Sequence, residues 1–192
     1  MMKSWELDYW YMDKCVSKKD RIYLNDYINK NYHHKEDASL ASANTETGKI
    51  KKFADTKVVY LKQIRDKIDN ILIHFINIAQ YQFGYHVFQP ADNDLVNYNT
   101  YSAKKNGRYG YHCDGSKSDV FDIKLTLLIN ISTKSYEGGE FKYFRNQEYE
   151  IPTLNIPGNA IVIRSNLNHQ VLPITKGERN TLTYFICGPR FR

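Results

Sequence analysis

After Gly84 the hydrophobic period of the sequence changes, and this change constrains the fold more than any other feature. Short segments rich in β-branched and aromatic residues follow one another, separated by Gly, Asn and Pro, and each is typical of a β-strand. They cover residues 85–88, 94–101, 123–132, 140–145, 160–165, 169–174 and 181–187. Because no helical pattern interrupts them, the series predicts a sandwich or barrel rather than alternating strands and helices.

Two helical segments precede these strands. Ser17 and Asp20 are spaced as in a capping box, which predicts a helix over residues 18–30. A longer helix, for which Asp55 or Thr56 is available as N-cap, is indicated by apolar residues three or four positions apart. These residues are Leu61, Ile64, Ile68, Ile71, Phe75 and Ile78. Such an apolar stripe must cover a sheet, so we expect helices packed on one face of the β structure.

Two further segments have a less regular pattern. Residues 5–11 alternate aromatic and polar side chains and predict an outer strand. Residues 31–56 contain few apolar side chains and predict a long loop, or two short strands around one. Long loops in small domains often cover functional sites, so we expect this loop and residues 103–111 to form a mobile rim. The adjacent His33 and His34 have no third ligand nearby and are expected to be exposed loop residues.

The bulk composition limits the class of protein. A chain of 192 residues with 42% hydrophobic and 14% aromatic residues is a folded single domain rather than a disordered chain. It contains no apolar run of membrane-spanning length and no signal peptide, and its three cysteines are too dispersed for a disulfide framework. We therefore expect a cytoplasmic location. The net charge of +6 comes from scattered lysines and arginines, which favours a solvated surface and leaves an acidic partner as an alternative.

The most informative functional motif is His112-Cys113-Asp114, followed far downstream by His169. Residues two apart on an extended segment leave the same face, so His112 and Asp114 point together while Cys113 points away. With His169 they offer two imidazole nitrogens and one carboxylate. This ligand set suits Fe(II) and leaves three coordination positions open.

A cation follows the second histidine at a short distance. The guanidinium of Arg179 can hold a carboxylate in bidentate geometry, and Thr181 lies two residues further on the same predicted strand. Thr181 therefore points to the same side and can add a hydroxyl donor.

These motifs together resemble the Fe(II)/2-oxoglutarate-dependent dioxygenases and, within them, the prolyl 4-hydroxylase-like branch. The final motif is especially similar to bacterial and phage PKHD-type hydroxylases, and the resemblance covers about residues 85–188. The matching stretches are His112-x-Asp114, the strand Leu125-Thr126-Leu127-Leu128-Ile129-Asn130, Gly138-Gly139-Glu140-Phe141, Pro157-Gly158-Asn159-Ala160, and His169-x-Val171-x-Pro173-x-x-x-Gly177-x-Arg179.

The resemblance implies a mainly β fold with added helices (α+β). Its core would be a double-stranded β-helix, a jelly-roll or cupin-like barrel, with N-terminal helices packed on one face. Residues 1–192 would form a single dioxygenase domain, with supporting helices at about residues 17–80 and the barrel at about residues 85–188.

The resemblance also implies roles for individual residues. His112, Asp114 and His169 resemble the iron ligands, and Arg179 resembles the residue that pairs with the distal carboxylate of 2-oxoglutarate. Tyr101 resembles a tyrosine that reaches the same carboxylate, and Tyr109 resembles a tyrosine near the substrate. Where some relatives have a further tyrosine this chain has Leu128, which implies a more apolar co-substrate pocket.

The reaction implied is hydroxylation of a prolyl residue in a peptide or protein, using Fe(II), 2-oxoglutarate and O2 and releasing succinate and CO2. Two alternatives remain open. One keeps the chemistry but acts on a nucleic-acid base or a small metabolite. The other is a non-catalytic cupin-like module that only binds a ligand, and the intact ligand set with Arg179 argues against it.

Overall fold

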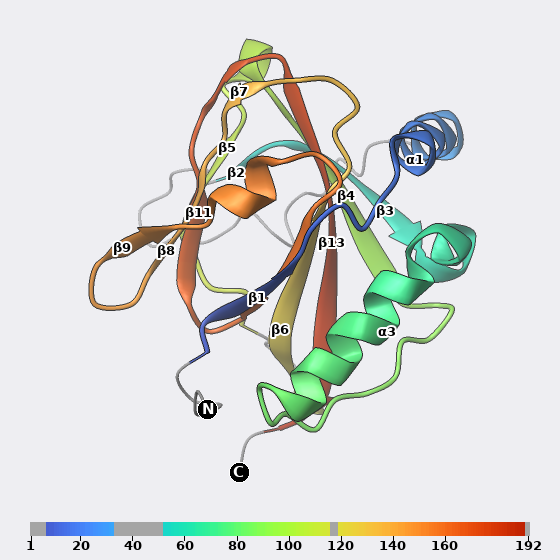
Figure 1. The fold of residues 1–192 in the computed structure, drawn as a ribbon, viewed down its shortest axis with the longest axis vertical. Coiled ribbons are helices and arrows are strands. Elements are labelled where there is room, and N and C mark those ends of the chain that lie inside the picture. Colours follow the sequence, from blue (N-terminus) through green and yellow to red (C-terminus); the bar gives the residue numbers. More distant parts are fainter. Residues whose placement is uncertain (1–6, 33–51, 116–118, 191–192) are drawn as a thin grey trace.

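Antiparallel strands of the described residues form two main sheets and one two-stranded sheet. The two main sheets enclose the candidate site, and helices cover the outer face of the larger one (Figure 1). The computed structural model describes residues 7–32, 52–115 and 119–190. Within these ranges no helix is long and apolar enough to cross a membrane.

The larger sheet forms the centre of the molecule. Its strands lie in the order β1 (Tyr9–Met12), β10 (Ala160–Arg164), β6 (Phe121–Asn130), β13 (Glu178–Pro189), β4 (Leu95–Ser102) and β3 (Asp55–Tyr60). The long strand β13 pairs with β4 on one side and with β6 on the other. Its residues therefore face alternately toward the helices and toward the smaller sheet.

The smaller sheet carries the other half of the site. Its order is β2 (Lys52–Phe53), β5 (Arg108–His112), β11 (Asn168–Val171), β8 (Phe141–Phe144) and β9 (Glu148–Glu150), and β7 (Glu137–Gly138) pairs separately with β12 (Ile174–Lys176). From β4 onward the chain passes repeatedly between the sheets. This alternation is typical of a double-stranded β-helix and confirms the predicted fold class.

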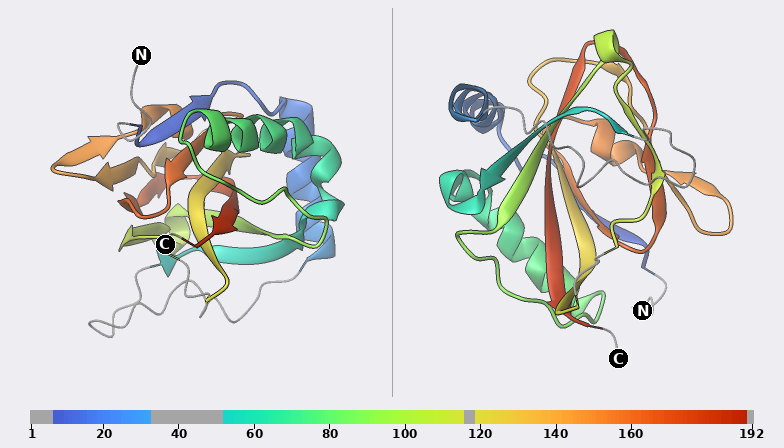
Figure 2. Two further views of the ribbon diagram at one scale, coloured as in Figure 1. Left: turned by 90° about the horizontal axis from the view of Figure 1, so that it is seen from below. Right: turned by 180° about the vertical axis from the view of Figure 1, so that it is seen from behind.

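Two helices pack against the larger sheet, as predicted. They are α1 (Lys18–Asn31) and α3 (Arg65–Tyr81), and short 3-10 turns lie at η2 (Leu61–Gln63), η3 (Ala103–Lys105) and η4 (Pro152–Asn155). Ser17 caps α1 by accepting a 3.1 Å hydrogen bond from the backbone N–H of Asp20, which confirms the predicted capping residues. Figure 2 shows both helices on one side of the β structure.

The two faces of the larger sheet bury two separate hydrophobic clusters. The larger cluster lies under the helices and contains the predicted stripe of α3, including Ile68, Ile71 and Phe75. The second lies on the opposite face, and its members include Phe141, Ile161 and Val171. A sheet that buries both faces is a rigid support for the site between the sheets.

Two predictions about local structure were wrong. Residues 85–88 form no strand, because a bond from Phe88 N–H to Cys187 O is not extended into a ladder. Asp55 and Thr56 do not cap a helix, because they begin β3, which pairs with β4 along its whole length. The helix α3 begins only at Arg65, and Ile64 at its N-cap provides no side-chain hydrogen bond.

The described parts of the predicted loop and rim contain regular structure. Helix α1 continues to Asn31, and β2 and the first residues of β3 lie in the segment for which a loop, or two short strands around one, was predicted. The rest of β3 lies where a helix was expected. Residues 103–111 consist of η3 and most of β5, so they are largely regular structure. The pair His33 and His34 lies outside the described residues. The predicted outer strand is confirmed as β1, which starts at Tyr9.

Candidate functional site

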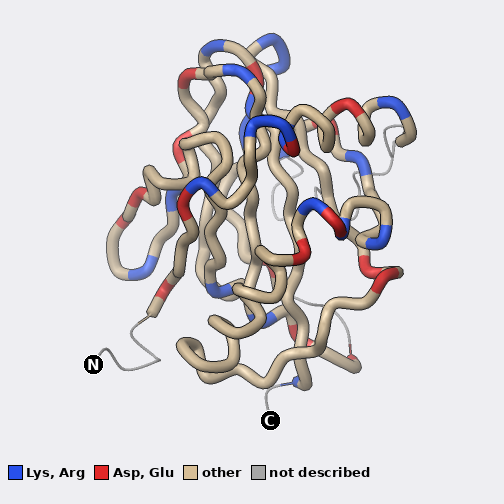
Figure 3. Tube along the Cα trace, turned by 45° about the vertical axis from the view of Figure 1, so that its right-hand side comes forward, with Lys and Arg blue, Asp and Glu red and all other residues tan. Residues whose placement is uncertain are grey.

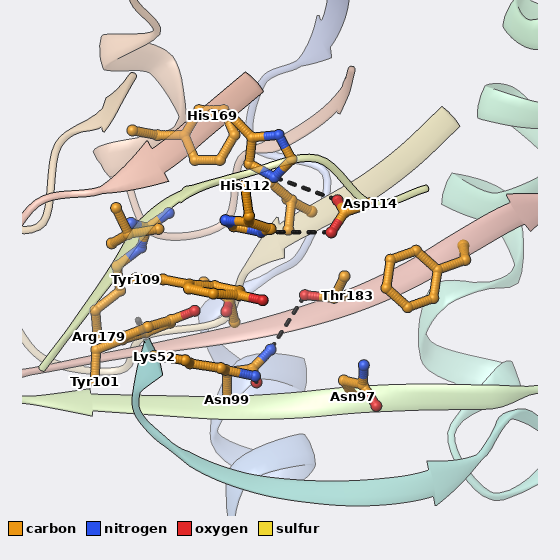
Figure 4. Close-up of a pocket in the computed structure, with 15 residues that line it drawn as sticks. Lys52, Asn97, Asn99, Tyr101, Tyr109, His112, Asp114, His169, Arg179 and Thr183 are labelled. Atoms are coloured by element: carbon orange, nitrogen blue, oxygen red, sulfur yellow. Dashed lines mark hydrogen bonds and ion pairs between the residues drawn. The ribbon is translucent and has the colours of Figure 1, made fainter. Parts of the chain in front are cut away.

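A cavity between the two sheets brings together the side chains that the sequence singled out (Figure 4). The smaller sheet contributes His112, Tyr109 and His169. Strand β4 contributes Asn97, Asn99 and Tyr101, and β13 contributes Arg179, Thr181, Thr183 and Phe185. All candidate residues therefore line one cavity.

The candidate metal ligands converge on one point. His112 Nε2 lies 3.4 Å from Asp114 Oδ1, and His169 Nε2 lies 3.3 Å from Asp114 Oδ2. One potential ligand atom of each residue lies within 4.8 Å of the others. These three residues form a group able to hold a metal ion among the residues described, and two imidazoles with one carboxylate suit Fe(II).

Backbone carbonyls fix the orientation of both imidazole rings. His112 Nδ1 lies 2.8 Å from Gly110 O, and His169 Nδ1 lies 2.9 Å from Leu167 O. A carbonyl oxygen only accepts, so each Nδ1 carries a hydrogen and each Nε2 is the nitrogen that can bind a metal ion once it is unprotonated. Each Nε2 faces Asp114 and is available to a cation.

The carboxylate of Asp114 is also held in place. Thr126 on β6 donates its hydroxyl hydrogen to Asp114 Oδ2 at 2.8 Å, and the backbone N–H of Asp114 donates to Ser165 O at 2.9 Å. Thr126 is fully buried, so this hydrogen bond is shielded from solvent. The neighbouring Cys113 is exposed and donates to Asn166 O, so it points away from the cluster, as expected.

The electrostatics of the cluster favour a bound cation. Burial alone would raise the pKa of Asp114, but the two adjacent histidines outweigh it and hold the pKa well below its usual range. Burial lowers the pKa of His112 and outweighs the attraction of Asp114. The carboxylate is therefore ionised and His112 is neutral at neutral pH, as in metal ligands. Burial would lower the pKa of His169, but the attraction of Asp114 outweighs it and raises that pKa, so a metal ion that binds His169 displaces a proton.

The guanidinium of Arg179 is buried at the other end of the cavity. Only 1% of the residue is exposed, and Nη1 donates to Gly139 O at 2.7 Å. Its Nε has no hydrogen-bond partner among the residues described. A buried cation with an unused donor that faces a cavity is suited to an anionic ligand.

Gly138 and Gly139 let the chain turn closely against Pro173 and Ile174. Both have φ in the left-handed region, +79° and +74°, and an added Cβ would lie 2.3 Å from Pro173 O at Gly138 and 2.3 Å from Ile174 Cδ1 at Gly139. The Gly138-Gly139 pair of the sequence motif therefore has a steric reason, and the same turn contains the Gly139 carbonyl that accepts from Arg179.

Other candidate residues also line the cavity. Burial raises the pKa of Tyr101 to about 12, so its hydroxyl is protonated and can donate to a carboxylate. Tyr109 stacks on His112, with ring centroids 3.5 Å apart and an interplanar angle of 18°. Thr181 is buried on the same face of β13 as Arg179, and Leu128 supplies an apolar wall.

Several lining residues were missed by sequence reasoning. Thr183 and Phe185 continue the two-residue alternation from Arg179, and Asn97 and Asn99 continue it back from Tyr101. That alternation was a usable signal. The buried Lys52 had no such signal, because it lies at the end of a segment that reads as a polar loop.

Comparisons with known proteins agree with the geometry. The model of the 2OG-Fe(II) oxygenase superfamily matches residues 78–187. A PKHD-type hydroxylase of Stenotrophomonas maltophilia is 28% identical over 126 residues, which cover 60% of this chain and 52% of that protein. The chain thus spans about half the length of the curated relatives it matches.

Solved structures share the fold at low sequence identity. A viral collagen prolyl hydroxylase from Paramecium Bursaria Chlorella virus-1, in its 2-oxoglutarate complex, has a TM-score of 0.67 and 17% identity over 96% of this chain and 98% of that chain. A prolyl hydroxylase from Trichoplax adhaerens, in complex with a hypoxia inducible factor peptide fragment, has a TM-score of 0.64 and 13% identity over 93% and 83% of the two chains.

The fold is a double-stranded β-helix with a buried group of residues that could hold a metal ion. The chain belongs to the 2OG-Fe(II) oxygenase superfamily. Within that superfamily it is similar to the prolyl 4-hydroxylase-like branch.

Proposed function

We propose that this chain hydroxylates a prolyl residue in a peptide or protein, with release of succinate and CO2. One observation supports this chemistry most directly: a single cavity contains both an anion-binding group and a group that could hold a metal ion. Arg179 lies at one end of the cavity and the histidine–carboxylate cluster at the other (Figure 4). We also propose that residues 1–192 act as one domain, with the barrel supported by the helices.

The proposed iron ligands are His112 Nε2, His169 Nε2 and a carboxylate oxygen of Asp114. Bound Fe(II) supplies the activation of O2 that is coupled to decarboxylation of 2-oxoglutarate. The protein fixes the ligand atoms through the carbonyls of Gly110 and Leu167 and the hydroxyl of Thr126. Three ligands leave room on the metal for the co-substrate and O2.

Three residues are proposed to hold the distal carboxylate of 2-oxoglutarate. The unused Nε donor of Arg179 supports its role, because a guanidinium and a carboxylate match in charge and geometry. Tyr101 is the cross-strand partner of Arg179 and keeps its phenolic hydrogen at neutral pH. Thr181 lies on the same face of β13 and adds a hydroxyl.

The prolyl substrate is supported by the relatives. The curated relatives carry the name PKHD-type hydroxylase, and similar folds occur in prolyl hydroxylases, one of which binds a peptide fragment. Tyr109 is the residue proposed to contact the substrate, because it covers one face of the His112 ring beside the metal position.

A nucleic-acid base is the alternative target for the same chemistry. It would require a basic groove for the backbone and aromatic surfaces for stacking. Figure 3 shows Lys and Arg interspersed with Asp and Glu over the described part of the trace. This distribution favours the peptide substrate.

The test combines binding with product analysis. The protein is loaded anaerobically with Fe(II) and 2-oxoglutarate, O2 is admitted with proline-containing peptides, and products are identified by mass spectrometry. We expect one added oxygen atom on proline and one succinate for each hydroxylated peptide. Oxidation of nucleic acid or a metabolite, with every peptide unchanged, would overturn the prolyl assignment.

A further inference from the structure

A second buried cation lines the cavity and has no part in the roles described above. Lys52 lies on the short edge strand β2, opposite Tyr109 of β5, and is only 8% exposed. Its Nζ lies 2.8 Å from Asn99 Oδ1 and 5.4 Å from the centroid of the Tyr109 ring. In Figure 4 the Tyr109 ring lies between His112 and Lys52, so the ammonium is close to the metal position without contacting it.

The hydrogen bonds of Lys52 are incomplete. An ammonium has three N–H donors, and Asn99 Oδ1 is the acceptor for Lys52 among the described residues. That oxygen also accepts a 2.8 Å hydrogen bond from Thr56 Oγ1, and Asn99 Nδ2 donates to Thr183 at 3.2 Å. The partner of the lysine is therefore neutral, shared and held in place from the other side.

No carboxylate in the described part of the chain lies within 4.0 Å of Lys52 Nζ. Burial of a lysine without an opposite charge in contact is unfavourable, and lysines are almost never buried unless they are paired. Asn99 provides one hydrogen bond but no negative charge. The site is suited to an anion that arrives with a ligand.

The net charge of the cavity also indicates that a further anion can bind. The described charged lining residues are Lys52, Arg179 and Asp114, and both histidines are counted as neutral because metal-bound imidazoles are neutral. The two charges of Fe(II) and those of the 2-oxoglutarate dianion cancel, and Asp114 balances one of the two side-chain cations. One positive charge therefore remains after the metal and co-substrate are bound. Since Arg179 faces the co-substrate, the remaining charge belongs to Lys52.

We propose that Lys52 determines specificity by binding a carboxylate of the substrate peptide, supplied by an acidic side chain next to the target residue. This inference rests on the proposed peptide hydroxylation and names the class of peptide. The carboxylate replaces the missing charge partner of Lys52 and accepts its unused N–H donors. The adjacent Tyr109 ring bounds the same subsite, so a single contact region joins the acidic residue to the metal position.

The test uses pairs of fluorescein-labelled proline peptides in which Asp or Asn occupies each position flanking the proline. Affinities are measured by fluorescence anisotropy with zinc in place of Fe(II) and with 2-oxoglutarate present, so that no turnover is needed. In the unsubstituted protein we expect the best Asp peptide to bind at least about tenfold more tightly than its Asn partner, since hydrogen bonds to charged groups contribute about 1.5–3 kcal/mol.

Three variants assign this preference to the ammonium. Lys52→Met should reduce the Asp-to-Asn ratio to about one, and Lys52→Arg should keep most of it. Lys57→Met is the matched control. Lys57 is 7% exposed and bonds an asparagine, Asn29, but does not line the cavity. It should leave the ratio unchanged. In Lys52→Met the affinity for 2-oxoglutarate should also be unchanged.

The outcomes separate this proposal from the proposed function. If Asp and Asn peptides bind equally to the unsubstituted protein, or if Lys52→Met keeps the preference, Lys52 has no such role even though proline is hydroxylated. A large loss of 2-oxoglutarate affinity in Lys52→Met would assign the lysine to the co-substrate and overturn the inference.

A readout without turnover covers the case in which no peptide is hydroxylated. The NMR signal of the ¹³C-labelled Cε of Lys52, assigned by its loss in Lys52→Met, is followed in the zinc-loaded protein. It should shift with N-acetyl-aspartate amide and not with N-acetyl-asparagine amide. An unchanged signal with both would overturn the carboxylate subsite, and a shift with a phosphorylated oligonucleotide alone would assign it to nucleic acid.

Discussion

His112 and His169 are direct cross-strand partners on β5 and β11. This pairing joins two motifs that are far apart in the sequence and sets the distance between the two imidazoles. Because side chains alternate along a strand, a slip of one residue would turn one imidazole out of the cavity. The register of two short strands is therefore part of the metal site.

The first prediction concerns this cluster. His112→Ala, Asp114→Ala and His169→Ala should each abolish Fe(II) binding and turnover, because a set of three ligands cannot lose one without losing most of its affinity. The measurement is anaerobic Fe(II) titration, with circular dichroism to show that the barrel is intact. His74→Ala is the control, since His74 lies on α3 beside Phe75 and does not line the cavity. Stoichiometric Fe(II) binding by any of the three variants would remove that residue from the ligand set.

Thr126 allows a finer test of the same site. Thr126→Val keeps the shape of the side chain but removes the hydroxyl that donates to Asp114 Oδ2, so Asp114 loses its orientation. Mutations of such supporting partners typically cost about 10–100-fold in metal affinity, and we expect a loss in that range. Thr126→Ser keeps the donor and should keep most of the affinity. Equal Fe(II) affinity for Thr126→Val and the unsubstituted protein would show that this hydrogen bond does not orient the ligand.

Arg179 separates co-substrate binding from metal binding. Arg179→Ala should weaken 2-oxoglutarate binding by roughly 30-fold or more, because removal of one member of a buried charged pair costs about 2–5 kcal/mol. Fe(II) affinity should be nearly unchanged. Anaerobic titration of the Fe(II)-loaded protein with 2-oxoglutarate measures the effect, and Arg145→Ala on the exposed surface is the control. An Arg179→Ala protein with undiminished 2-oxoglutarate affinity would contradict the proposed role.

The acidic-peptide preference should depend on pH. Burial lowers the pKa of Lys52 to about 8, and the attraction of Asp114 offsets this only in part. The ammonium is therefore charged below this pH and neutral above it. Peptide carboxylates and Asp114 are ionised throughout, and burial keeps the facing Tyr109 protonated by raising its pKa.

The Asp-to-Asn affinity ratio should accordingly be high near about pH 7 and fall toward one by about pH 9. In Lys52→Arg the ratio should stay constant over this range, since a guanidinium remains charged. Anisotropy titrations at a series of pH values measure both curves. A ratio that rises with pH, or that falls equally in Lys52→Arg, would contradict the assignment to the lysine.

The sequence predicted the elements whose pattern is local. Alternation and turn residues identified β4, β6, β10 and β13, and the spacing of apolar residues identified the helices. It failed at β3, where the residues Asp55 and Thr56 resemble a helix cap but pair with β4. This segment is a strand because it pairs with β4, which is distant in the sequence. Local propensity carries no information about such a pairing partner.

The same distinction applies to the site. His112, Asp114, His169 and Arg179 could be chosen because their chemistry and spacing are specific. Lys52 could not, since it enters the cavity only because β2 pairs with β5. A lysine in a polar stretch reads as a surface residue until that pairing is known.

Strand β13 limits which substitutions the protein can accept. The inner face of β13 carries Arg179 and Thr181, while its outer face buries Leu182 and Ile186 in the core beneath the helices. A substitution along β13 therefore alters stability and co-substrate binding together. The two-residue edge strand β2 does not combine these two roles. A substitution at position 52, in evolution or by engineering, can therefore change substrate preference with the least effect on stability and co-substrate binding.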